Sequence, residues 1–221
     1  DAALRAWRDH SPYSWVGYYL VAPCQTGRTW VGRRSALRAA GWGTAIVFVG
    51  EQDWPGGVPD SVAAAGGKQC TVANLTAARG LMDAARADST TAAEGFASGA
   101  VVYLDVEPVD TVSARLEAYV RAWVSGMLAH GRYTPGIYAH ERNANALRAI
   151  VQSEYATANR SGDPPFWVAS QTGFDIGLAP SSSRVPYAAI WQGKFNVPET
   201  WGGVTLTVDA NVAVSPDPSG G

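Results

Sequence analysis

The sequence carries little charge and has no long hydrophobic run. Its 221 residues include 17 Lys and Arg against 19 Asp and Glu, a formal net charge of -2. Because the positive and negative charges nearly cancel, the protein has no broad positive field that would attract phosphate backbones. We therefore expect no nucleic-acid partner. No apolar stretch approaches the roughly 18 to 20 residues that cross a bilayer, so we expect no membrane span. With 47% hydrophobic residues, the chain is typical of a well-packed globular protein.

Motifs that mark several common enzyme classes are also missing. The sequence contains no G-x-G-x-x-G or G-x-x-x-x-G-K phosphate turn, no G-x-S-x-G elbow and no H-E-x-x-H zinc motif. Its 3 His and 2 Cys residues show no metal-ligand spacing. We therefore expect no metal and no cofactor, and we set aside zinc-hydrolase and serine-hydrolase functions.

Cysteine is scarce, with Cys24 and Cys70 the only two. A bridge between them would close a loop of about 46 residues and contribute roughly 4 kcal/mol through chain entropy. That interpretation favours an oxidising compartment. The alternative is that both are buried free thiols that act as small hydrophobic side chains.

Strands and helices alternate along the sequence. Apolar and β-branched runs predict seven strands, which begin at residues 15, 44, 100, 136, 166, 188 and 205. Helical spacing predicts helices over residues 1–9, 33–40, 74–87, 112–131 and 143–158, with a Gly- and Pro-rich loop over 53–67.

This alternation favours an α/β fold with a parallel sheet, and we expect a TIM-type (β/α)8 barrel. Because eight strands are needed and seven are predicted, the first strand would lie upstream of this chain. A doubly wound open sheet is the rival architecture. Neither a repeat nor a linker is evident, so residues 1–221 are expected to form one domain.

Two carboxylates follow the strongest predicted strand. Side chains alternate across a strand, so Tyr103, Asp105 and Glu107 share one face of the strand over 100–106. If the apolar face packs on helices, both acids point into the barrel axis just before Pro108. Their repulsion would raise one pKa and leave one acid and one anion at neutral pH, as glycoside cleavage requires. The alternative is that both lie on a loop rim, satisfied by Arg side chains or backbone N–H groups.

A further acid and several aromatic residues lie at other strand ends. Asp209 follows the last predicted strand, although a helix N-cap would also explain it. Aromatic rings that could stack on sugar faces fall on or beside strand ends, namely Tyr18, Tyr19, Tyr138, Trp167 and Trp191. Core packing is the alternative role for most of them.

Several segments together resemble a known family. They are residues 16–20 (VGYYL), 30–34 (WVGRR) leading to 41–42 (GW), 102–107 (VYLDVE), 136–138 (GIY), and 191–192 (WQ) with 208–211 (VDAN). These look like the secreted glycoside-hydrolase-like domains once called domain of unknown function 1906, which are related to the family 25 lysozymes. The similarity covers nearly the whole chain, and the D-x-E strand and the W-Q to D-x-N ending are its most specific parts.

The resemblance implies a (β/α) barrel that acts on the peptidoglycan glycan or another bacterial wall polysaccharide. By position, Glu107 matches the proton donor of the lysozymes, Asp105 its partner carboxylate, and Asp209 the acid on the last strand. Those relatives carry a further Asp on a first strand, in a G-F-D or similar motif, which is not found in this sequence. We expect either that this strand lies upstream of the given sequence or that the barrel is incomplete and lacks this acid. The residues expected to contact substrate are Tyr18, Tyr138, Trp167, Trp191 and Gln192.

We therefore expect a secreted, monomeric, muramidase-like glycoside hydrolase with a polysaccharide partner, its signal peptide being absent from this chain. Glu107 would protonate the leaving oxygen, and Asp105 or Asp209 would stabilise the oxocarbenium or activate the nucleophile. Two other functions stay open. A non-catalytic glycan-binding protein would keep the barrel mouth without a complete acid set, and a surface structural domain would have no saccharide affinity.

Overall fold

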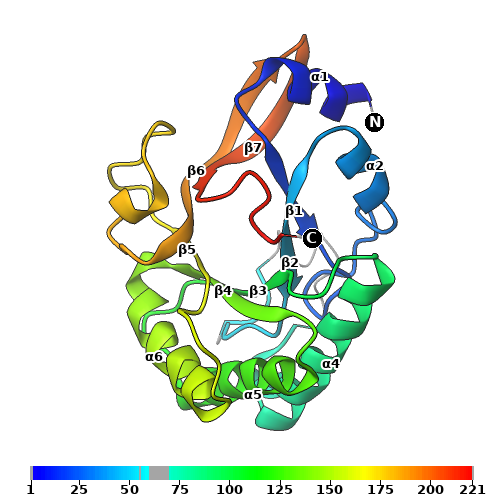
Figure 1. Ribbon diagram of the computed structural model, residues 1–221. Coiled ribbons are helices and arrows are strands. Elements are labelled where there is room, and N and C mark those ends of the chain that lie inside the picture. The colour runs from blue at the N-terminus through cyan, green and yellow to red at the C-terminus, as the bar shows by residue number, and fades with distance from the viewer. Residues whose placement is uncertain (1, 55, 60–69, 221) are drawn as a thin grey trace.

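A single curled sheet of seven strands organises the molecule (Figure 1). The computed structural model describes residues 2–54, 56–59 and 70–220. The strands, in sheet order, are β1 (Trp15–Tyr19), β2 (Gly43–Val49), β3 (Val101–Val106), β4 (Thr134–His140), β5 (Phe166–Ala169), β6 (Ala188–Trp201) and β7 (Val204–Ala213). Every predicted strand is present.

The direction of the last strand differs from the expectation of a parallel sheet. Strands β1 to β6 are parallel to their neighbours, whereas β7 is antiparallel to β6. Strands β1 and β7 are the two edges of the sheet, so the described residues form an α/β half-barrel and not a closed eight-stranded barrel.

The helices follow the predicted pattern closely. They are α1 (Ala2–His10), α2 (Arg34–Ala39), α4 (Ala77–Ala93), α5 (Ala114–His130) and α6 (Glu141–Thr157), with short 3₁₀ turns at Val72–Asn74 and Pro180–Ser182. Side-chain caps fix where two helices begin: the Thr76 hydroxyl accepts from Arg79 N at 3.1 Å, and the Ser113 hydroxyl accepts from Leu116 N at 3.2 Å. The loop predicted over 53–67 lies partly outside the described residues.

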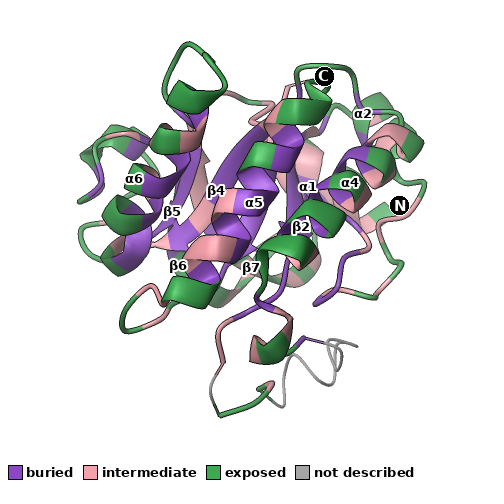
Figure 2. Ribbon diagram, turned by 90° about the horizontal axis from the view of Figure 1, so that it is seen from below, coloured by how far each residue is buried: buried purple, intermediate pink, exposed green. Residues whose placement is uncertain are grey.

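The two faces of the sheet have different neighbours. On β3, the apolar side chains of Val102, Leu104 and Val106 pack into the core beneath the helices. Figure 2 shows α4, α5 and α6 with their exposed sides outward and their buried sides toward the strands. The opposite, concave face has its own small core of Ala45, Val47, Tyr103, Trp167 and Ile190. Asp105 and Glu107 therefore face the concave side, as alternation along the strand requires.

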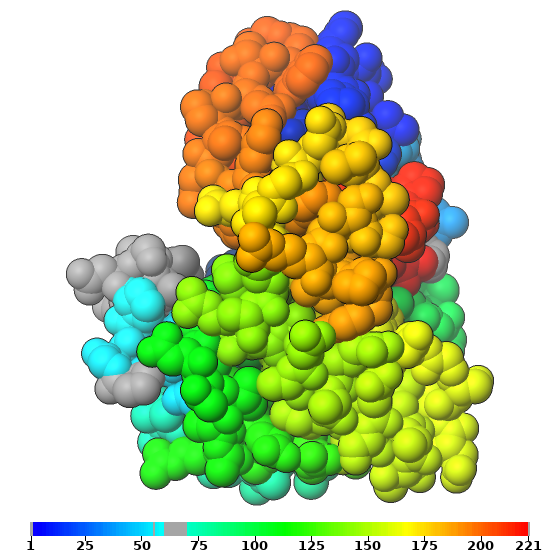
Figure 3. Space-filling view, turned by 90° about the vertical axis from the view of Figure 1, so that its left-hand side faces the viewer, coloured from blue at the N-terminus to red at the C-terminus, as the bar shows by residue number. Residues whose placement is uncertain are grey.

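Strands β6 and β7 continue past the sheet as a hairpin arm. The arm turns at Gly202 and Gly203, which both have positive φ, and α1 packs on it. Trp7 Nε1 donates a hydrogen bond to the Val204 carbonyl at 2.9 Å. In Figure 3 the arm and α1 stand above the body of helices, with the segment around residues 170–180 packed against the arm. Strands β6 and β7 are both longer than the strands predicted here. The first residues of β6 pair with the last residues of β7 in the curled part of the sheet, and the residues between them form the arm.

A disulfide and the C-terminal segment close other parts of the structure. Cys24 and Cys70 are bridged, with Cα atoms 5.1 Å apart, so the disulfide prediction is confirmed over the free-thiol alternative. Near the C-terminus, Ser219 N donates to the Thr44 carbonyl at 2.9 Å, and the Ser219 carbonyl accepts from Val101 N at 2.8 Å. The last residues thus cap the N-terminal ends of β2 and β3.

Among the residues that the structure describes, no helix is long and apolar enough to cross a membrane.

Candidate functional site

A cavity of about 600 Å³ lies on the concave side of the sheet. It reaches from the C-terminal ends of β3 and β4 to the arm and α1, so strand ends, the arm and α1 all contribute to its wall. Six of the eight predicted site residues line it, namely Asp105, Glu107, Tyr138, Trp167, Gln192 and Asp209. The residues predicted from the sequence therefore mostly gather at one cavity, and the other two, Tyr18 and Trp191, lie elsewhere.

The acid pair on β3 is buried to different depths. Asp105 is 9% exposed, and its Oδ1 has no hydrogen-bond partner among the described residues. Glu107, one step past the strand, is half-buried. Burial raises the pKa of Asp105 well above its usual range, and the nearby charge of Glu107 raises it further. Burial also raises the pKa of Glu107. The pair therefore retains a proton at a pH at which two exposed carboxyls would both be ionised.

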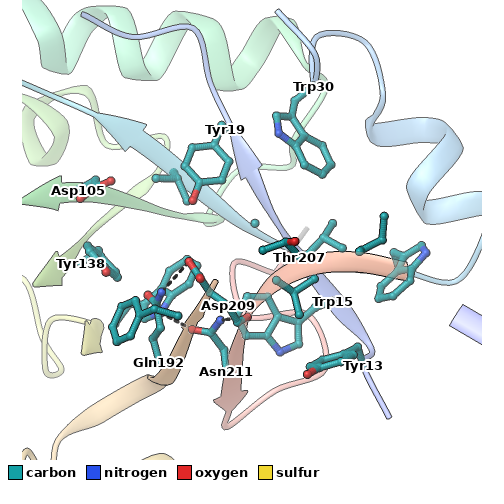
Figure 4. A pocket seen from close by; sticks show the side chains of 18 of the residues that line it. Tyr13, Trp15, Tyr19, Trp30, Asp105, Tyr138, Gln192, Thr207, Asp209 and Asn211 are labelled. Carbon is teal, nitrogen blue, oxygen red and sulfur yellow. Dashed lines mark hydrogen bonds between the residues drawn. The ribbon is translucent and has the colours of Figure 1, made fainter. Parts of the chain in front are cut away.

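Asp209 approaches the same cavity from β7. Its Oδ2 accepts a hydrogen bond from Gln192 Nε2 at 2.9 Å, and its Oδ1 accepts one from Asn196 N at 2.7 Å. Asn211, two residues later, accepts from Trp167 Nε1 at 2.9 Å and donates to the Asp209 carbonyl at 2.8 Å. Asp209 lies within a strand, so the N-cap alternative is wrong, and its carboxylate is held in one orientation (Figure 4).

Two tyrosines complete the polar part of the wall. Figure 4 shows Tyr19 and Tyr138 around the same space as Asp105 and Asp209. Burial is the main cause that raises the pKa of each phenol, and the negative charges of the three cavity acids add to it. Both hydroxyls therefore stay protonated across the neutral range and are available as hydrogen-bond donors.

Trp167 forms part of the cavity floor. It is only 5% exposed, and its ring makes edge-to-face contacts with Trp15, Tyr103 and Tyr138 at centroid distances of 5.4 to 5.8 Å. An aromatic cluster of this kind is rigid. It fixes the depth of the cavity and the direction of the Tyr138 ring beside the acids.

Two predicted substrate contacts are wrong. Tyr18 is fully buried on the helix side of β1, where its hydroxyl lies 2.5 Å from the Glu94 carboxylate and 2.6 Å from the Trp30 carbonyl. Trp191 is also fully buried; its Nε1 donates to the Ser170 carbonyl at 2.7 Å, and its ring packs against Phe174. Neither side chain reaches the cavity, because each lies on the opposite face of its strand.

The same alternation identifies residues that the predicted site omitted. On β1, Trp15, Val16, Gly17 and Tyr19 line the cavity, whereas Tyr18 packs with the core under the helices. Tyr18 has apolar neighbours at positions 16 and 20, and that set fits the helix-facing side. Applying to β1 the rule already applied to 103, 105 and 107 would have selected Tyr19. Asn211 was visible only as part of the D-x-N ending.

The carboxylates of the three cavity acids do not lie close enough together to share one metal ion. Among the described residues, the one group of His, Cys, Asp or Glu side chains close enough to share an ion is Cys24, Glu51 and Cys70, and those cysteines are joined in the disulfide. What the cavity offers is proton transfer from a buried carboxyl pair, a fixed carboxylate opposite, and hydroxyl and amide groups for polar ligand atoms.

Comparisons with known proteins agree with this architecture. The family model described as Rv2525c-like, glycoside hydrolase-like domain matches residues 5–213. No curated protein matches the sequence.

Solved structures share the fold at low sequence identity. An uncharacterized Bacillus stearothermophilus protein is 16% identical, with a TM-score of 0.62 over 98% of this chain and 92% of that one. The Mycobacterium tuberculosis Tat-secreted protein Rv2525c, solved with HEPES, is 19% identical, with a TM-score of 0.54 over 97% and 91%. The Clostridium perfringens spore cortex lytic enzyme SleM is 10% identical, with a TM-score of 0.55 over 90% of this chain and 60% of the enzyme.

Proposed function

The chain belongs to the Rv2525c-like, glycoside hydrolase-like domain family, and from that premise we propose that it hydrolyses a glycosidic bond in a bacterial cell-wall polysaccharide. The observation that carries the proposal is the proton-retaining pair Asp105 and Glu107, which faces Asp209 across one cavity. Two carboxyl groups in unlike environments are what this reaction needs.

In the proposed mechanism, Glu107 is the proton donor. It lies nearer solvent than Asp105, so its carboxyl group can meet a glycosidic oxygen that enters the cavity. The proton moves to that oxygen, the bond to the anomeric carbon breaks, and the electron pair leaves with the oxygen. Asp209 supplies negative charge to the developing oxocarbenium. Water then bonds to the anomeric carbon, and the proton that it loses is taken up by a cavity carboxylate, which restores the proton of the pair. Burial raises the pKa of Glu107, which favours the protonated form that a proton donor requires.

The polar groups around the acids suit a sugar ligand. Tyr19 and Tyr138 offer hydroxyl donors, and Gln192 and Asn211 hold Asp209 and Trp167 in place. Among the structural neighbours, SleM is a spore cortex lytic enzyme, which supports a wall polysaccharide as the substrate class.

We also propose that the protein works outside the cytoplasm, as a monomer. The disulfide supports an oxidising compartment, and one structural neighbour is a Tat-secreted protein. We also propose that the sheet closes into a TIM-like barrel through an additional strand between β1 and the antiparallel strand β7. These are the two sheet edges, and residues from both line the cavity.

The test is release of new reducing ends from purified bacterial walls and a panel of soluble polysaccharides, with wild type beside Glu107→Gln. Release by wild type that is lost in the variant supports the proposal and identifies the substrate class. Release that is equal in both removes Glu107 from the mechanism.

One observation favours a second candidate, a glycan-binding protein without turnover. Both Asp209 carboxylate oxygens already accept hydrogen bonds, which reduces their capacity to act as a nucleophile or base. Equal binding of wall fragments by wild type and Glu107→Gln, with no reducing ends from either, would establish this function instead.

A further inference from the structure

The side chain of Gln52 holds the backbone that carries both catalytic acids. Gln52 is 1% exposed. Its Nε2 donates to the Asp105 carbonyl at 2.7 Å and to the Gly50 carbonyl at 3.2 Å, and its Oε1 accepts from Glu107 N at 2.9 Å. We propose that Gln52 is a positioning residue that sets the direction of the Glu107 carboxyl group. This inference rests on the proposed hydrolase function.

The amide of Gln52 takes the place of a missing strand residue. The β2–β3 pairing ends where Val49 lies opposite Asp105. In a parallel pair, the next residue of β2 would donate to the Asp105 carbonyl and accept from Glu107 N, because the hydrogen bonds slant to the residues on either side of the one opposite. Gln52 makes those two bonds with its side chain. The sheet is thereby extended by one position at the point where the acids emerge.

Gly50 explains why the main chain leaves the ladder. A Cβ on this residue would lie 2.5 Å from the Tyr119 hydroxyl oxygen and 2.7 Å from Leu104 Cδ1. The chain can therefore pass close to α5 only as glycine, and it turns away from β3 there. The Tyr119 hydroxyl also accepts from Glu51 N at 3.1 Å, which holds the turn from behind.

The residue between Gly50 and Gln52 is anchored as well. The Glu51 carboxylate accepts from Thr71 N at 3.2 Å and from Asn74 Nδ2 at 3.1 Å, and it pairs with Arg79 at 3.0 Å. Gln52 therefore starts from a fixed backbone, so its amide is set before any ligand binds. This is the rigidity that a positioning residue requires.

Removing the amide would release Glu107. Pro108 and Asp110 beyond it are exposed, and Pro108 has no N–H to contribute to a sheet. Without Gln52, Glu107 N would lose its partner on the β2 side and the acid would gain freedom. A misplacement of about 1 Å can cost on the order of 10²-fold in rate.

The experiment compares Gln52→Met, Gln52→Glu and the exposed loop control Gln171→Met. We expect Gln52→Met to lower kcat roughly 10- to 100-fold, with a much smaller change in KM and no change in the control. Gln52→Glu should regain activity at acidic pH, because a protonated carboxyl offers the same donor and acceptor as the amide. Its activity should fall as that carboxyl ionises, whereas Gln52→Met should not recover at any pH.

A second readout does not depend on turnover. The titration of Glu107, followed by NMR of 13C-labelled Glu side chains and assigned with Glu107→Gln, should move toward the ordinary carboxyl range in Gln52→Met. If wild type shows no turnover but this shift occurs, the positioning role stands and the proposed function fails. A folded Gln52→Met with wild-type kcat and an unmoved Glu107 titration would overturn the positioning role.

Discussion

At the residue scale, the central feature is an acid pair whose burial works against folding. Asp105 retains its proton more strongly in the folded protein than in the unfolded chain, because burial and Glu107 both disfavour its charge. A raised folded pKa means that the folded state binds more protons, so the stability contributed by this group is greatest at low pH and declines as pH rises through the folded value. At neutral pH, the free-energy cost of burying this acid pair is therefore offset by the rest of the fold.

Asp105→Asn should for this reason stabilise the protein at neutral pH. We expect a higher Tm than wild type at pH 7, by about 2 to 4 °C for each ~1 kcal/mol gained, and a difference that shrinks as pH falls toward the ordinary carboxyl range. Thermal unfolding across pH measures both. The control is Asp110→Asn at an exposed site, and an Asp105→Asn protein less stable than wild type at pH 7 would contradict this explanation.

Adjacent tyrosines on β1 provide a second test at this scale. Tyr19 lines the cavity, whereas the Tyr18 hydroxyl is buried against Glu94. Tyr19→Phe should lower kcat/KM roughly tenfold, the value of one hydrogen bond, with little change in Tm. Tyr18→Phe should do the reverse and cost about 1 to 3 kcal/mol of stability. Steady-state kinetics and thermal unfolding of both variants measure these effects. A Tyr18→Phe protein with a larger kinetic defect than Tyr19→Phe would refute the assignment of Tyr19 to the cavity and Tyr18 to the core.

The two tyrosines also show what could be predicted from sequence. The D-x-E pair was placed correctly because alternating apolar residues fix which face of β3 the acids occupy. Aromatic side chains such as Tyr18 and Trp191 are compatible with either face, so their composition alone did not determine their direction. Gln52 lay outside any predicted strand, and its role depends on where β2 ends, which has no local sequence signal.

At the scale of elements, the arm is the part that the sequence prediction missed. Periodicity indicated strands that begin near 188 and 205, and both are present, but it did not indicate their full length. The hairpin signal was the Gly202-Gly203 pair, since a two-residue turn of this type needs positive φ at both positions. Its consequence is that β7 returns antiparallel and carries Asp209 back to the cavity. Elements with strong local patterns, such as α5, were predicted well.

The turn gives a matched pair of variants. A Cβ on Gly202 would lie 2.9 Å from the Ala6 carbonyl oxygen and 2.7 Å from the His10 ring, whereas one on Gly203 would meet nothing within 4 Å. Gly203→Ala should therefore cost about 1 to 2 kcal/mol from backbone strain alone. Gly202→Ala should cost more, because it also displaces α1. Urea unfolding midpoints measure this order, and equal costs would mean that α1 does not rest on the turn.

At the scale of the whole molecule, the cavity lies where three parts meet. The curled sheet supplies the acid pair, the arm supplies Asp209, and α1 covers the arm. The C-terminal segment and the disulfide hold other regions of the chain, at the N-terminal strand ends and beside the turn at Gly50. No single element contains the site, so the site forms only when the sheet, the arm and α1 are all folded.

We propose that Glu107 donates a proton in glycosidic bond cleavage. The most direct test of this proposal is the initial rate of reducing-end release from one purified wall preparation by wild type, Glu107→Gln, and Glu117→Gln, whose side chain pairs with Arg121 on α5. We predict a loss of roughly 10² to 10⁴ in rate for Glu107→Gln and a wild-type rate for Glu117→Gln. A folded Glu107→Gln protein that releases reducing ends as fast as wild type would contradict the claim.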